Sequence, residues 1–333
     1  MGSSFGAGKS LDILTQPMQS ANSTDTLHLS VELASGKNSL VLANPVMAAS
    51  GTFSYGVEYA KVFDIQRLGA IVSKTTTLQP KAGSPPGRRI DETPAGMLNS
   101  IGLQNVGIEK VLRDYAPTWA RWRVPVIVSV LGATVEEYGE CAARLEGAEG
   151  IAGLELNISS PNALQGGMEF GQDGRTAASV TASVVRSTTL PVIVKLTPNV
   201  TDIAAIARAV VDAGADALCV VNTLQAMTID ARARAPRITR VFAGLSGPAM
   251  KPVALRMVWQ VASAVDVPII GCGGIASGTD AVEFLLAGAT AVQVGTATFR
   301  NPRAPLDVLE GIEAYMRETG VRDVRDLIGA ARR

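Results

Sequence analysis

Residues 190–222 read LPVIVKLTPNVTDIAAIARAVVDAGADALCVVN, and this stretch holds one complete repeat of the predicted fold. Its two ends, 190–196 and 216–222, are short apolar runs rich in β-branched residues, typical of strands buried on both faces of a parallel sheet. The segment between them, 201–215, opens on a Thr/Asp cap and closes at Gly214, which predicts a helix. The stretch therefore predicts a strand–helix–strand unit.

The same alternation continues along the chain. AGADAL (213–218) and AGATAV (287–292) are near-copies at helix-to-strand junctions. Eight apolar runs are expected to be strands: 40–48, 69–74, 124–130, 151–157, 190–196, 216–222, 267–274 and 290–295. Eight strands alternating with helices predict an α/β fold of the (β/α)8 TIM-barrel type. An open doubly wound sheet is the alternative, disfavoured because the units show no topological break.

Two longer segments are expected to lie over the mouth of the barrel. The segment 77–105 is rich in Pro, Gly and polar residues, and it predicts a loop or small hairpin. A second long loop is expected from Ser159 to about Arg175. Together they would form a lid, the alternative being ordinary surface loops.

Composition excludes several classes of function. The 333 residues include 30 basic and 30 acidic side chains, so no net charge attracts nucleic acid. Cys141, Cys219 and Cys272 are widely spaced without a CxxC pair, and His28 is the single histidine, so we expect a reduced, cytoplasmic chain without a metal site. No apolar run is long enough to span a membrane. Residues 1–26 are expected to form a disordered tail before one domain, 27–333.

Two lysines interrupt apolar strands. Lys74 and Lys195 stand in IVSKTTT and VIVKLTPN. A buried charge is costly unless it is paired, so these lysines either reach the surface or face a polar or anionic ligand at the strand tips. Their occurrence on two different strands favours the ligand.

Glycines follow the last two predicted strands, at Gly273, Gly274 and Gly295. Their backbone N–H groups can bind phosphate, as in many barrels. GCGGIA also fits a loose dinucleotide pattern, but the next strand has no acidic residue, which favours a mononucleotide. Lysines, amides and a phosphate site together suggest flavin mononucleotide (FMN). An imide-containing substrate could pair with the amides of Asn99, Asn157, Asn162 and Asn222.

Eight motifs resemble the dihydroorotate dehydrogenase family. They are ASGTFSYGVEYAK, SKTTTLQPKAGSPPGRR, GMLNSIGLQN, ELNISSPN, KLTPNVTDI, GLSGPAMKPVAL, GCGGI and VGTATF. Their order and spacing match from about residue 28 to the end, and they look most like the class 1B catalytic subunit. The resemblance implies a barrel that oxidises (S)-dihydroorotate to orotate in pyrimidine biosynthesis, with hydride transfer to flavin N5.

The resemblance also implies site residues. Ser160 would take the C5 proton. The substrate would contact Lys74, Asn99, Ile101, Gly102, Leu103, Asn157, Asn162, Asn222 and Thr223. FMN would contact Ala49, Ser50, Lys74, Thr75, Ser129, Asn157, Lys195, Val221, Gly247, Gly273, Gly274, Gly295 and Thr296.

Ser160 departs from the family pattern, because class 1 members usually carry cysteine as the base. A hydroxyl is a far weaker base than a thiol and needs a proton relay, a water or the positive field of Lys74 and Lys195. The serine is therefore either natural or a replacement that impairs the enzyme. The alternatives in function are another flavin-dependent dihydropyrimidine oxidoreductase, a non-catalytic barrel subunit and a phosphate-binding barrel isomerase.

The resemblance leaves the partner open: we expect a homodimer, with a heterotetramer that includes an FAD/iron–sulfur electron-transfer subunit as the alternative. Class 1B enzymes use a second subunit with FAD and a [2Fe–2S] cluster in a heterotetramer, and this chain has no cysteine cluster for such a group. Class 1A enzymes are homodimers that reduce fumarate. Class 2 enzymes reduce quinone through an apolar N-terminal extension, whereas this N-terminus is polar.

Overall fold

The computed structural model describes residues 26–35, 39–159 and 170–333, and its centre is a closed barrel of parallel strands. In chain order the barrel strands are β3 (Val46–Ala48), β4 (Ala70–Val72), β7 (Val126–Val130), β8 (Gly153–Asn157), β9 (Val192–Leu196), β10 (Ala217–Val220), β15 (Ile269–Cys272) and β16 (Ala291–Val294). Each pairs with its neighbour in the sequence of strands, and β16 pairs with β3 to close the ring. The predicted TIM barrel is confirmed.

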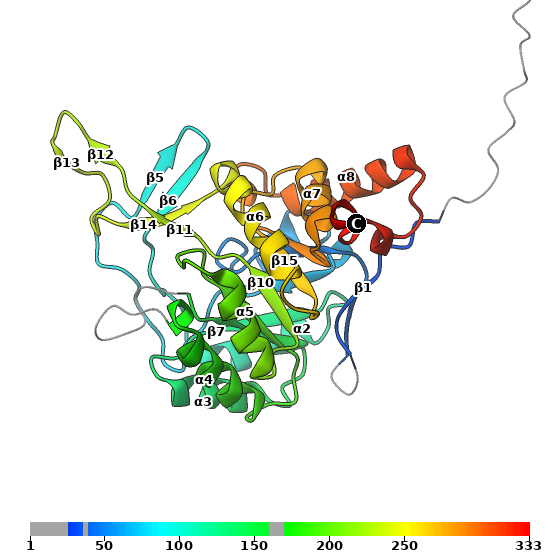
Figure 1. Ribbon diagram of the computed structural model, residues 1–333. Coiled ribbons are helices and arrows are strands. Elements are labelled where there is room, and N and C mark those ends of the chain that lie inside the picture. The colour runs from blue at the N-terminus through cyan, green and yellow to red at the C-terminus, as the bar shows by residue number, and fades with distance from the viewer. Residues whose placement is uncertain (1–25, 36–38, 160–169) are drawn as a thin grey trace, which may run out of the picture.

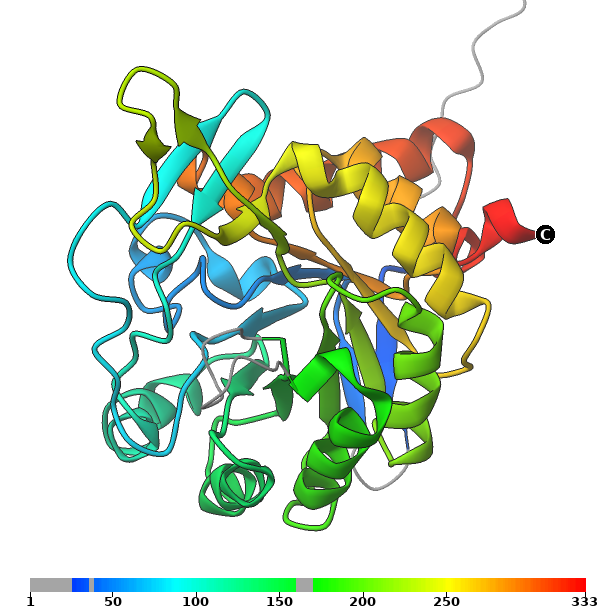
Figure 2. The ribbon, with the colours of Figure 1, turned by 60° about the vertical axis from the view of Figure 1, so that its left-hand side comes forward.

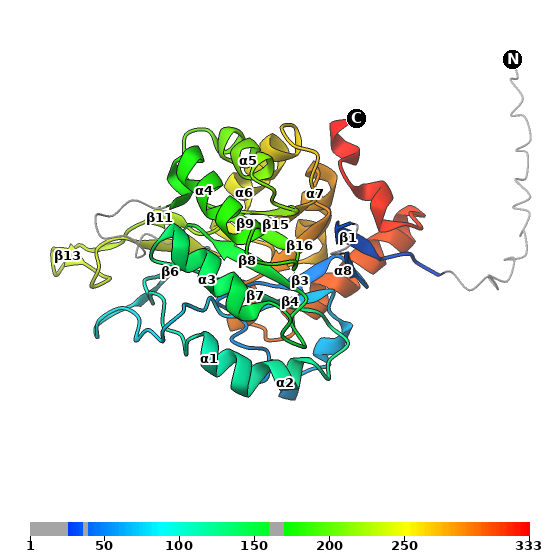
Figure 3. The same ribbon diagram turned by 90° about the horizontal axis from the view of Figure 1, so that it is seen from below.

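Helices surround the strands, as Figure 3 shows. After β7 each strand is followed by one long helix: α3 (Val135–Leu145), α4 (Gly174–Val185), α5 (Ile203–Asp212), α6 (Lys251–Ala262), α7 (Gly278–Ala287) and α8 (Ala304–Thr319). The first two units are less regular. Short 3-10 turns follow β3, and the segment after β4 combines α1 (Ile108–Lys110), a π-helical stretch and α2 (Ala116–Trp119). Among the described residues, no helix combines the length and hydrophobicity of a membrane span.

Capping residues define the helix starts that the sequence predicted. Asp202 accepts a hydrogen bond from Ala205 N at 3.0 Å before α5. Ser277 and Asp280 form a reciprocal capping box before α7, which ends at Gly288 with φ +117°. These contacts satisfy backbone groups that a helix terminus leaves without partners.

The first predicted strand, 40–48, is wrong as a single element. It divides into β2 (Leu40–Leu42) and the barrel strand β3, while β2 pairs in antiparallel fashion with β1 (Val31–Ala34). The break lies at Asn44, whose Oδ1 accepts from Val46 N and whose Nδ2 donates to Arg67 O. Pro45 follows directly and has no N–H for a ladder.

A four-stranded antiparallel sheet stands over the mouth of the barrel (Figures 1 and 2). Its order is β11 (Leu224–Ala226), β14 (Ala243–Ser246), β6 (Gly96–Asn99) and β5 (Ile90–Thr93). The hairpin expected within 77–105 is therefore confirmed as β5–β6. The other half of the sheet, and the β12 (Ile229–Asp230) to β13 (Ala235–Pro236) hairpin beside it, were not predicted. The expected lid loop falls largely on residues 160–169, which lie outside the described residues.

Helices α7 and α8 cross where two glycines meet. A Cβ built on Gly311 would lie 2.8 Å from the Cα of Gly278, closer than carbon atoms pack. Alanine normally stabilises a helix interior by about 1 kcal/mol relative to glycine. Here the backbone of α7 blocks that gain, because neither helix can move without disturbing the core.

We therefore expect Gly311→Ala to lower the free energy of unfolding by roughly 1–3 kcal/mol, as overpacked cores do. Denaturant unfolding followed by circular dichroism measures it. Gly174→Ala is the matched control, since its Cβ would meet Ala209 Cβ at an ordinary 3.4 Å. A Gly311→Ala protein as stable as the control would show that the helix crossing is loose.

Candidate active site

A cavity of about 400 Å³ lies between the carboxyl ends of the barrel strands and the antiparallel sheet above them. The sheet contributes Asn99 and Ser246, and the barrel contributes Lys195. A second cavity of about 90 Å³ lies beside the ends of β15 and β16. The two cavities share Ser50, Thr52, Lys195, Asn222, Thr223, Ser246 and Thr296 in their linings, so they form one continuous mouth.

Most of the predicted site residues meet in these two cavities. Those that line the larger are Ser50, Lys74, Thr75, Asn99, Ile101, Gly102, Leu103, Asn157, Lys195, Asn222, Thr223 and Thr296. Those confined to the smaller are Ala49, Val221, Gly247, Gly273, Gly274 and Gly295. Ser129 lines neither cavity. It is fully buried, and its Oγ lies 2.9 Å from Thr75 Oγ1. Ser160 and Asn162 lie outside the described residues.

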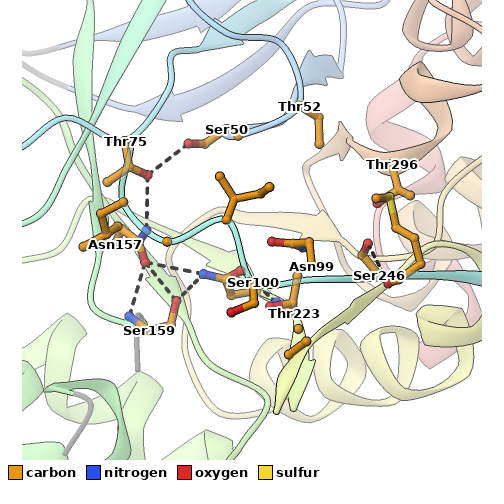
Figure 4. Close-up of a pocket in the computed structure, with 18 of the residues that line it drawn as sticks. Ser50, Thr52, Thr75, Asn99, Ser100, Asn157, Ser159, Thr223, Ser246 and Thr296 are labelled. Atoms are coloured by element: carbon orange, nitrogen blue, oxygen red, sulfur yellow. Dashed lines mark hydrogen bonds between the residues drawn. The ribbon is translucent and has the colours of Figure 1, made fainter. Parts of the chain in front are cut away.

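A network of amides and hydroxyls spans the floor of the larger cavity (Figure 4). Asn157 donates through Nδ2 to Thr75 Oγ1 at 3.2 Å, and that oxygen also lies 3.3 Å from Ser50 Oγ. Asn157 Oδ1 accepts from Ser159 Oγ at 3.1 Å and from Asn222 Nδ2 at 3.4 Å. These contacts join the ends of four strands, so the amide orientations are held before any ligand arrives.

The two predicted lysines occupy different electrostatic settings. Lys74 lies beyond the end of β4, and burial lowers the pKa of its ammonium group. The backbone of Lys74 is hydrogen-bonded, its N–H donating to Ser54 O at 2.7 Å, but its ammonium group has no hydrogen bond or ion pair within the described part of the chain. Lys195 lies inside β9 and donates to Gln293 Oε1 at 2.9 Å. Burial alone would lower its pKa, but Cys219, Cys272 and Glu155 outweigh desolvation and raise it.

The glycine pair after β15 has the features of an anion cradle. Gly273 and Gly274 have φ of +127° and +84°, a region that favours glycine. A Cβ at Gly274 would lie 2.6 Å from Lys251 N, and one at Gly273 would lie 2.8 Å from Ala254 Cβ. Their N–H groups bond to no other described residue, which leaves two donors beside the smaller cavity. The donor set thus fits a phosphate.

Comparison with known proteins agrees with this geometry. A family model described as dihydroorotate dehydrogenase matches residues 33–316. A Desulforamulus reducens protein named "Dihydroorotate dehydrogenase B (NAD(+)), catalytic subunit" is 57% identical over 303 residues, covering 91% of this chain and 99% of its own. A Geotalea uraniireducens protein of the same name is 55% identical, covering 91% and 97%. The chain belongs to the dihydroorotate dehydrogenase family.

Several cavity residues of this family member were missed by the sequence reasoning. The antiparallel sheet adds Met97 and Ser246, the residue just before β14 adds Phe242, and the barrel adds Glu155. Gln293 lies behind the lining and touches Lys195. A signal was present for Glu155 and Gln293, because each is a polar residue inside an apolar strand, as the lysines are. The sheet residues had no such signal, since their position depends on pairing between distant segments.

We expect Lys74→Met to stabilise the ligand-free protein, because methionine removes a partly buried ammonium group that no described residue pairs with. A lysine whose folded pKa is lowered binds its proton more readily when unfolded, so the penalty is full below the folded pKa and fades as pH rises to the ordinary 10.5. The gain in melting temperature should therefore shrink between neutral and alkaline pH.

Thermal unfolding across pH measures this gain, with Lys61→Met at an exposed lysine as the control. Lys74→Met should also bind an anionic ligand more weakly than wild type. Equal melting temperatures for Lys74→Met and wild type at neutral pH would contradict the argument.

Proposed function

We propose that this chain is the catalytic subunit of a B-type dihydroorotate dehydrogenase that uses FMN to oxidise dihydroorotate to orotate. The observation that carries the proposal is the continuous mouth, in which two lysines, two asparagines joined by a hydrogen bond and a glycine cradle converge. The relatives described above support the reaction and the class. In an FMN-dependent oxidoreductase, the amides and cations would serve the substrate and the flavin ring, and the glycine cradle would serve the flavin phosphate.

FMN fits the residues present. Gly273 and Gly274 would bind its phosphate through backbone N–H groups, and Lys195 would place a fixed positive charge at its ring system. When bound, FMN supplies the hydride acceptor that no amino-acid side chain provides. Thr75, held by Ser129 and Asn157, would fix the position of the ring from the side of β4.

The substrate would lie between the floor and the antiparallel sheet. Asn157 and Asn222 offer amide donors and acceptors from the floor, and Asn99 does so from the sheet. Such groups match the imide of the substrate, which has N–H and C=O groups side by side. Lys74, whose ammonium group has no partner among the described residues, adds a positive charge to the same cavity, where it can meet the negative charge of the substrate carboxylate.

Ser160 would take the C5 proton, as the family motif implies. A serine hydroxyl is a weak base, so the positive charges of Lys74 and Lys195 would stabilise its ionised form. We propose an electron-transfer subunit with FAD and an iron–sulfur cluster as the partner. That subunit would accept electrons from the flavin and pass them to NAD⁺.

Purification of the chain tests the reaction. The protein should carry a flavin absorption band with about one FMN per chain, and it should reduce an artificial electron acceptor with dihydroorotate but not with dihydrouracil. Turnover of dihydrouracil in preference would favour another dihydropyrimidine oxidoreductase. Co-purification of an equimolar FAD- and iron-containing protein from the source cells would support the B-type assembly, whereas reduction of fumarate by the chain alone would refute it.

Substitution at position 160 tests the base. We expect Ser160→Ala to lower kcat by roughly 10²–10⁴, the usual contribution of a general base. Ser160→Cys should move the rising limb of the kcat/KM profile to lower pH, because a thiol ionises more readily than a hydroxyl. Ser159→Ala is the matched control with a smaller effect on kcat. Identical pH profiles for Ser160→Cys and wild type would mean that another group takes the proton.

A further inference from the structure

Three polar side chains form a chain of contacts inside the barrel. Glu155 on β8, Lys195 on β9 and Gln293 on β16 have exposed fractions of 0%, 5% and 1%. Lys195 Nζ donates to Gln293 Oε1 at 2.9 Å, and Gln293 Nε2 donates to Glu155 Oε2 at 2.6 Å. An ammonium group can only donate and a carboxylate accepts, so these partners fix the orientation of the Gln293 amide.

The carboxylate of Glu155 is incompletely paired. Its Oε1 lies 3.7 Å from Lys195 Nζ, an ion pair too long for a hydrogen bond, and the atom is buried without a hydrogen-bond partner in the described parts of the chain. Burying two charges in this way costs more than filling the space with apolar side chains. The arrangement therefore contributes little to stability. Its position beside the cavity indicates a role in binding the ligand.

The Lys195 ammonium group lies between the cavities and its partners inside the barrel. Lys195 lines both cavities, Glu155 lines the larger one, and Gln293 lines neither. Gln293 thus holds Lys195 from behind, on the side away from the cavities. Without that hydrogen bond, the ammonium group could move the short distance needed to contact Glu155 Oε1 directly, and a direct ion pair would weaken its positive field at the mouth.

We propose that Glu155 is a positioning residue that acts through Gln293. It orients Lys195 toward the ring of the bound flavin, and its negative charge limits the positive field that the flavin meets. This inference rests on the proposed function, because it requires FMN in the mouth of the barrel. It assigns to two buried residues the control of how strongly the site favours reduced over oxidised flavin.

Substitutions at Glu155 and Gln293 should shift the midpoint potential of the bound flavin in opposite directions. Glu155→Gln removes the negative charge but keeps a hydrogen-bond acceptor for Gln293, so the charge of Lys195 is no longer balanced. Reduced flavin carries more negative charge than oxidised flavin and should gain affinity relative to it. We expect the ratio of the affinity for reduced flavin to the affinity for oxidised flavin to rise at least about tenfold. For a two-electron couple this corresponds to a midpoint potential about 30 mV more positive.

Gln293→Met should shift the potential in the negative direction. The variant conserves volume but leaves Lys195 free to close on Glu155, so the positive charge near the flavin falls. The affinity of the apoprotein for oxidised FMN should fall as well. Glu155→Asp keeps the charge and should keep the midpoint potential near that of wild type.

The measurements are a redox titration against reference dyes and a fluorescence titration of apoprotein with FMN. Asp91→Asn is the matched control, because Asp91 is another buried carboxylate, 2% exposed, that accepts from Arg88 and Thr228 and lines neither cavity. The midpoint potential should be unchanged in that variant, whatever its stability.

The outcomes separate the two proposals. A wild-type protein that binds no FMN, or that fails to oxidise dihydroorotate, would overturn the proposed function. A normal wild type with unchanged potentials in Glu155→Gln and Gln293→Met would overturn this inference alone. If Glu155→Gln does not fold, Gln293→Met decides the matter, and a shift in the positive direction or no shift there refutes the role of Gln293 in holding Lys195.

Discussion

The pairing of β16 with β3 is the contact on which the rest of the structure depends. It joins the last barrel strand to the first, with Val292 opposite Val46 and Val294 opposite Ala48. Because every strand in the ring is parallel, closure places all carboxyl ends on one rim. Ser50 follows β3 and Thr296 follows β16, and both line the same two cavities. Residues far apart in sequence thus share one site through backbone pairing alone.

Much of the barrel could be predicted because strands buried on both faces must be apolar throughout. The same rule failed at 40–48, where an apolar run contains a hairpin strand and a barrel strand, and composition does not distinguish them. The sheet above the mouth was only half predictable. Its β14 pairs with β6, with Gly244 opposite Asn99, across a separation that no local pattern encodes. The strands there are also too short to show alternation.

The candidate site was predictable where a residue follows a strand end, since the rim of a barrel is where such side chains gather. Lys74, Asn157 and Asn222 lie there as expected. Sequence could not separate residues that face the cavity from residues behind it. Ser129 supports Thr75 from a fully buried position, and Gln293 supports Lys195. The direction of a side chain in a tilted barrel strand depends on register, which the closed ring determines.

The two lysines show how one fold gives the same side chain two properties. Lys195 has Gln293 and Glu155 as partners within the barrel, so its positive charge is present before any ligand binds. The ammonium group of Lys74 is buried without a partner in the part of the chain that the structure describes, and its pKa is lowered. An anion that reaches Lys74 supplies the missing partner and favours its charged form. The partners of Lys195 are therefore built into the folded protein, whereas the pKa of Lys74 depends on whether an anionic ligand is bound.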